Sequence, residues 1–147
     1  MSWHENLIED DEQLRDILHQ AKKIAVVGIK DESKKNEAAH KVPEYLKDHG
    51  YEIVPVSPQY ENVFGVKSLE NLSDLDEPVD TILMFRAPQH IPSHAKEVLE
   101  MKEKPQVVWM QSGIRNMQAA HELAAAGIKV VQDHCFYRDH LRLVRHD

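Results

Sequence analysis

The pattern of apolar positions begins with an uninterrupted run, residues 24–27, that leads directly into Gly28. A short apolar run bounded by polar or breaking residues is typical of a strand buried on both faces. The glycine suits the point at which the chain leaves a sheet and turns. We predict further strands over residues 51–56, 80–85, 106–110 and 128–131.

Between these strands, apolar residues recur at intervals of three and four, which is the period of an amphipathic helix. The inward-facing positions of four predicted helices are Leu14, Ile17, Leu18 and Ala21, then Val42, Tyr45 and Leu46, then Ala95, Val98 and Leu99, and finally Ala120, Leu123 and Ala124. Pro43 and Pro92 are each expected in the first turn of their helix, where the missing N–H costs nothing. Residues 64–66 predict a turn, and the leucines that follow predict a short helix.

The ends of the chain carry weaker patterns. Residues 1–9 are expected to form a flexible tail, and a segment from Asp133 closes the chain. The acidic run at residues 9–12 is interpreted as a helix start, because carboxylates are favourable at the positive end of the helix dipole. A metal site there is the less favoured alternative.

Strands that alternate with helices predict an α/β fold, a doubly wound, mostly parallel five-stranded sheet with helices on both faces. The length of 147 residues is expected to form a single domain. Ligands of such sheets bind outside the carboxyl ends of the strands. Those ends hold residues 28–30, 57–58, 85–86, 111–115 and 133–135.

Composition narrows the classes of function. No apolar run reaches the roughly 20 residues of a membrane helix, and the N-terminus has no signal-peptide pattern. The formal net charge of −7 argues against nonspecific nucleic-acid binding. Cys135 is the one cysteine, which rules out an internal disulfide. We therefore expect a cytoplasmic protein with a small-molecule ligand and no membrane or nucleic-acid partner.

The common nucleotide fingerprints are absent. After Gly28 the next glycine is Gly50, so there is no G-x-G-x-x-G, and no Walker A pattern occurs. The end of the second strand holds Ser57-Pro58 instead of the acid that binds the ribose of NAD. An NAD(P)-binding regulator is therefore a disfavoured alternative.

Motifs at the strand ends resemble a known family. They are residues 25–28, 39–43, 50–51, 54–58, 85–86, 109–114, 130–131 and 133–135. In this order they resemble the stand-alone CoA-binding domain family, which is Rossmann-like and similar to the CoA-binding half of the succinyl-CoA synthetase alpha subunit. The resemblance runs from about residue 24 to about residue 143. It implies that the chain binds coenzyme A.

The resemblance also implies which residues bind. The diphosphate is expected at Gly28, Ile29 and Lys30, and the adenosine end at Val56, Ser57 and Pro58. Phe85 and Arg86 would line the cleft, and Gln111, Ser112, Gly113 and Ile114 would meet the pantetheine arm. His40, in the matched motif, and Cys135, at the ligand edge, complete the candidate set.

This chain departs from the family pattern in the loop after the first strand. Residues 29–38 form a longer loop, and Glu37-Ala38 replace the usual Arg-Pro or Arg-Ser pair. Lys34 or Lys35 would then supply the phosphate contact, because an ammonium serves as a point charge for phosphate. The alternative is that these lysines are simply solvated. Ser57 stands where asparagine is more usual.

No catalytic set is evident. His134 neighbours Cys135, but adjacent residues of an extended chain point to opposite sides. We favour a packed thiol, with a mixed disulfide to the CoA thiol as the alternative. His90 and His94 have metal-ligand spacing but no third ligand follows at a recognisable distance. The sequence predicts a non-catalytic CoA or acyl-CoA binder; the alternative is a component of an acyl-CoA ligase or transferase that needs a partner subunit.

Overall fold

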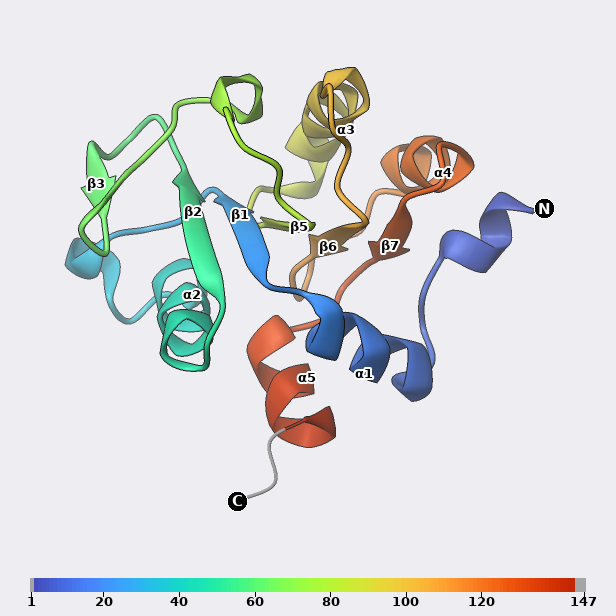
Figure 1. The fold of residues 1–147 in the computed structure, drawn as a ribbon, viewed down its shortest axis with the longest axis horizontal. Coiled ribbons are helices and arrows are strands. Elements are labelled where there is room, and N and C mark those ends of the chain that lie inside the picture. Colours follow the sequence, from blue (N-terminus) through green and yellow to red (C-terminus); the bar gives the residue numbers. More distant parts are fainter. Residues whose placement is uncertain (1, 145–147) are drawn as a thin grey trace.

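A five-stranded sheet forms the centre of the protein, seen in a computed structural model that describes residues 2–144 (Figure 1). Every neighbouring pair of its strands is parallel. In spatial order the strands are β2 (Glu52–Val56), β1 (Lys23–Val27), β5 (Thr81–Met84), β6 (Val107–Met110) and β7 (Lys129–Val131). The predicted strands and the Rossmann-like α/β class are confirmed.

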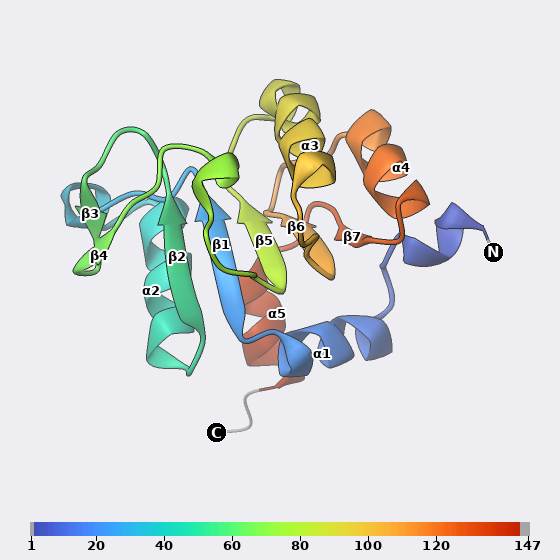
Figure 2. The same ribbon diagram turned by 45° about the horizontal axis from the view of Figure 1, so that its top comes forward.

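Helices cover both faces of the sheet (Figures 1 and 2). One face packs against α1 (Asp11–Gln20), α2 (Ala38–Asp48) and α5 (Phe136–Leu143), and the other packs against α3 (Ile91–Glu100) and α4 (Met117–Ala125). Alternate residues of β1 divide between the two cores: Ile24 and Val26 join the first, and Ala25 and Val27 the second. Within the described residues, no helix is long and apolar enough to cross a bilayer.

The strand order reverses between β1 and β5. The chain moves outward from β1 to β2 and then returns to the other side of β1, where β5, β6 and β7 follow in sequence. The loops after β1 and β5 therefore leave the sheet in opposite directions, which opens a crevice between their carboxyl ends.

The expected flexible tail is wrong from Trp3 onward. Trp3–Asn6 form a 3-10 helix that packs on α4, where the Asn6 side-chain amide donates to the Ala124 carbonyl at 2.9 Å. Leu7 forms a bridge with Val130 in the edge strand β7, and Ile8 is buried. This segment covers backbone groups that β7 would otherwise leave unpaired.

Three smaller predictions have mixed outcomes. Asp10 caps α1 by accepting from the Gln13 N–H at 2.8 Å, so the acidic run is a helix start. The turn at residues 64–66 closes an unpredicted hairpin of β3 (Asn62–Val63) and β4 (Val66–Lys67). The predicted short helix is a 3-10 helix, Leu72–Asp74.

Tyr51 gives the fold a dependence on alkaline pH. Its buried hydroxyl donates to the Leu18 carbonyl at 2.5 Å, and burial raises the pKa of Tyr51 to about 12, from 10.0. Because the pKa is higher in the folded state, this contribution is complete below pH 10 and is lost as the pH rises toward 12. A shift of this size corresponds to a folding free energy on the order of 3 kcal/mol.

We expect urea unfolding at pH 9 to 11.5 to show a steeper loss of stability in the wild type than in Tyr51→Phe. The variant loses a hydrogen bond worth about 1 kcal/mol at neutral pH, but it has no phenol to ionise at this position. Parallel stability profiles for the two proteins would contradict this role of Tyr51.

Candidate functional site

A cleft of about 560 Å³ lies at the carboxyl ends of β2, β1 and β5, where the strand order reverses. Its size is typical of sites for small molecules. Residues predicted for the site that line it are Gly28, Lys30, Val56, Ser57, Pro58, Phe85 and Arg86. Three separate strand-end motifs of the sequence therefore meet in one cavity.

Gly28 is required where the three strand ends approach one another. Its φ is +82°, and a Cβ built there would lie 2.4 Å from the Phe85 carbonyl oxygen. The Gly28 N–H donates to the Val56 carbonyl at 2.9 Å, and the Phe85 N–H donates to the Val27 carbonyl at 2.8 Å. A side chain at position 28 would force these strand ends apart.

Helix α2 holds the next part of the loop through the backbone of Lys30. The Lys30 N–H donates to the Ala39 carbonyl at 3.1 Å, and the Lys30 carbonyl accepts from Nδ1 of the buried His40 at 2.9 Å. His40 does not line the cleft, although the sequence placed it among the binding residues. Its contact is with the backbone of a residue that does.

Pro43 explains why the Ala39 carbonyl is available. The prediction that Pro43 lies in the first turn is wrong, because α2 begins at Ala38 and Pro43 is its sixth residue. A proline inside a helix removes the N–H that would bond to the carbonyl four residues earlier. Here that carbonyl belongs to Ala39, and it accepts from Lys30 instead.

The cleft contains cations and one carboxylate. Lys30 and Arg86 contribute positive charge, and the Lys30 Nζ donates to the Gln59 Oε1 at 3.2 Å. Glu70 also lines the cleft, and so does His94, whose Nδ1 donates to the Glu97 Oε1 at 2.7 Å. Two cations beside the turn at Gly28 form an arrangement suited to an anion.

Other candidate residues from the same loop lie outside the cleft lining. The side chain of Ile29 is fully buried in the core, so its backbone is the part available to a ligand. Lys34 and Lys35 are exposed, at the end of the 3-10 helix Glu32–Lys34 and just after it. Their contact with a phosphate stays a prediction.

The loops after β6 and β7 form a second group farther along the same edge. Gln111 is buried, and its Oε1 accepts from the Phe136 N–H at 3.2 Å, which joins the end of β6 to the start of α5. Ser112 and Gly113 are exposed, whereas Ile114 is buried. The Gly113 N–H donates to the Asp133 Oδ1 at 2.6 Å and thereby lowers the pKa of that carboxyl. None of these residues lines the 560 Å³ cleft.

The side chains around Cys135 are engaged in packing α5. Cys135 is half-buried against the first core, immediately before α5. His134 Nδ1 contacts the Oδ2 of the buried Asp139 at 2.8 Å. Arg142 joins the same carboxylate at 3.1 Å and Asp11 of α1 at 2.8 Å. Among residues 2–144, no three His, Cys, Asp or Glu side chains are grouped so that they could hold a metal ion.

Several residues that line the cleft were not predicted for it: Val27, Gln59, Glu70, Asn71, Leu72, Ala87, His90 and His94. Residues 70–72 arrive there because Leu69 pairs with the end of β2, donating to the Pro55 carbonyl and accepting from the Ser57 N–H. An isolated bridge of this kind leaves no periodic signal in the sequence. The spacing of His90 and His94 places both side chains at the cleft, although it is also the spacing of metal ligands.

The amino-acid sequence and the fold of this chain are similar to those of known proteins. A CoA binding domain model matches residues 22–140. An uncharacterised Bacillus subtilis protein, YneT, is 37% identical over 123 residues, which cover 84% of this chain and 88% of that protein. A solved structure from Thermus thermophilus is 42% identical, with a TM-score of 0.84, and covers 92% of this chain and 99% of its own. A hypothetical protein from Pyrococcus horikoshii is 32% identical, with a TM-score of 0.85 and coverage of 93% and 94%.

Proposed function

The chain belongs to the CoA-binding domain family, and we propose that it binds coenzyme A or an acyl-CoA without transforming it. The observation that carries this proposal is the meeting of Gly28, Ser57 and Arg86 in one cleft at the reversal of strand order. This is where a doubly wound sheet binds nucleotides. The anionic CoA suits the cations of Lys30 and Arg86 found there.

The proposed arrangement follows the order of the strands. The diphosphate would lie against the backbone of residues 28–30, near Lys30 and Arg86. The adenosine end would lie beside residues 56–58, at the end of edge strand β2. The pantetheine arm would extend in the other direction, toward residues 111–114 at the end of β6, because β6 lies beyond β5.

The non-catalytic part of the proposal rests on the contacts near Cys135. Asp139 is fully occupied by His134 and Arg142, and this cluster ties α5 to α1. These contacts give His134 and Asp139 a structural role, which is to hold α5 in place.

Isothermal titration with CoA, acetyl-CoA, NAD and NADP in parallel tests the choice of ligand. We expect saturable binding of the CoA species alone. Mass spectrometry of the mixture after incubation of the protein with acetyl-CoA would show that the acetyl-CoA thioester is intact. Binding of NAD or NADP instead of CoA, or turnover of acetyl-CoA, would contradict the proposal.

Pro43 gives a prediction that separates positioning from stability. In Pro43→Ala the new N–H competes with the Lys30 N–H for the Ala39 carbonyl, so the hydrogen bond that holds the loop after β1 against α2 is weakened. We expect CoA binding about three- to tenfold weaker, as for one hydrogen bond of about 1 kcal/mol. The melting temperature is not expected to fall, because alanine is a better helix residue than proline. Asp48→Ala, an exposed change in the same helix, serves as the control, and wild-type affinity in Pro43→Ala would refute the role.

A further inference from the structure

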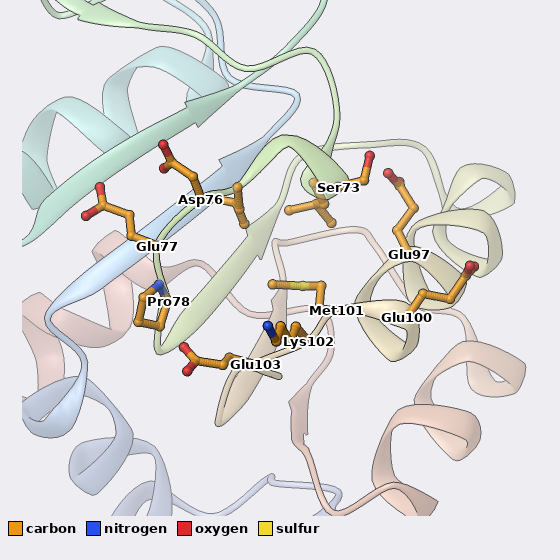
Figure 3. Close-up of a pocket in the computed structure, with 11 residues that line it drawn as sticks. Ser73, Asp76, Glu77, Pro78, Glu97, Glu100, Met101, Lys102 and Glu103 are labelled. Atoms are coloured by element: carbon orange, nitrogen blue, oxygen red, sulfur yellow. The ribbon is translucent and has the colours of Figure 1, made fainter.

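A second hollow, larger than the cleft, lies on the side of the sheet covered by α3 (Figure 3). It encloses about 680 Å³ between the 3-10 helix Leu72–Asp74, residues 75–78, and the end of α3 with the loop that follows. We call it the acidic groove. Apart from Leu72, which lines both cavities, none of its residues takes part in the proposed CoA site.

The acidic groove has an apolar floor and a charged rim. Leu72, Leu75 and Met101 supply the apolar surface. The lining also holds five carboxylates and one ammonium, which are Asp76, Glu77, Glu97, Glu100, Glu103 and Lys102. Its formal charge of −4 is more than half of the −7 of the whole chain. Figure 3 shows Glu97 and Glu100 on one side and Asp76 and Glu77 on the other, with Met101 between them.

Only part of this charge is balanced within the fold. Glu77 pairs with the Lys23 Nζ at 2.7 Å, and Glu97 accepts a hydrogen bond from the His94 Nδ1 at 2.7 Å. In the described part of the chain, residues 2–144, the other three carboxylates form no ion pair.

The position of the charge along α3 is also unfavourable for the helix itself. Glu97 and Glu100 lie in the last turn of α3, which contains no basic residue. Carboxylates are disfavoured there because the C-terminal end of a helix dipole is negative. Side chains that conflict with local stability in this way are expected where they serve binding.

The carboxylates of the acidic groove are spaced apart along its rim, and this spacing determines which kind of cationic ligand can bind them. They do not gather into a group that could hold a metal ion, within the residues that the structure describes. An extended chain with several cations matches them better. Lysine and arginine lay their methylene stems on apolar surface while their charged ends reach carboxylates. We propose that the acidic groove docks a basic, amphipathic segment of a partner protein.

A fluorescent, amidated peptide of alternating arginine and leucine is a direct probe of this surface. We expect saturable binding to the wild-type protein, measured by anisotropy at low salt and weakened by added salt. The triple variant Asp76→Asn, Glu100→Gln, Glu103→Gln should bind at least about tenfold more weakly, since each exposed ion pair contributes up to about 1 kcal/mol. A peptide with serine in place of leucine should also bind more weakly, because the apolar floor then has no partner.

A matched triple variant controls for the net charge of the protein. Glu9→Gln, Asp16→Asn and Glu61→Gln remove the same three charges from exposed positions outside the groove. This control should bind the peptide within about twofold of the wild type, and melting curves of both triple variants check that they fold. Equal weakening by the two triple variants, equal binding of the serine peptide, or no saturable binding to the wild type would overturn the proposal.

Discussion

Gly28→Ala is expected to abolish CoA binding and to lower the free energy of unfolding by about 2 to 4 kcal/mol. At φ +82° an L-residue is strained, and the added Cβ would lie 2.4 Å from the Phe85 carbonyl oxygen. That atom belongs to the backbone of the residue directly after β5, so the overlap is relieved only if the ends of β1 and β5 separate. Urea unfolding and titration calorimetry measure the two effects.

Gly50→Ala is the control for Gly28→Ala. Gly50 has φ +94°, yet a Cβ built there would meet no atom within 4 Å. This variant therefore carries the conformational cost alone, about 1 to 2 kcal/mol, and should bind CoA normally. If Gly28→Ala bound CoA as well as Gly50→Ala does, the close approach of β1 and β5 would not shape the site.

Arg86→Ala should weaken CoA binding by about 10- to 100-fold, because a hydrogen bond to a charged group contributes about 1.5 to 3 kcal/mol. Arg86 is half-buried in the cleft, next to Gly28. Arg86→Lys should give an intermediate loss of affinity, because lysine keeps the positive charge but lacks the planar, bidentate hydrogen-bonding geometry of the guanidinium. The salt dependence of binding should become shallower in Arg86→Ala.

Arg115→Ala is the matched control for Arg86. Arg115 also follows a strand of the same sheet, but it is exposed, lies outside the cleft and pairs with Asp133 at 3.5 Å. Its loss should change CoA affinity by less than about threefold, as for an exposed ion pair. Equal losses from the two variants would mean that general charge, and not the cleft, attracts the ligand.

The sequence was most informative where one physical requirement dominates. A strand buried on both faces must be apolar throughout, so β1 and its exit glycine were predictable, and Gly28 lies where the strands meet. The helix α5 was less visible because its buried stripe includes the polar Asp139 and His140. Asp139 is paired by its sequence neighbours His134 and Arg142, whereas the partner of His140 is Tyr45 of the distant helix α2, which no local pattern predicts.

The candidate site was predictable to the same degree. The strand ends that form the cleft follow from the topology of a parallel sheet, and Ser57 and Arg86, which were predicted to bind the ligand, line it. Residues 70–72 depend on one bridge between Leu69 and Val56, which is a tertiary contact. The role of His40 was not predictable either, because its Nδ1 bonds to the Lys30 carbonyl, a tertiary contact between α2 and the loop after β1.

The central claim is that CoA lies across the carboxyl ends of β2, β1 and β5. A crystal structure of the protein with CoA tests it most directly. We predict that the diphosphate lies within hydrogen-bond distance of the Ile29 backbone N–H, the Lys30 ammonium and the Arg86 guanidinium, with the pantetheine arm toward residues 111–114. CoA bound at any other surface, or no CoA in the cleft at a saturating concentration, would contradict the account.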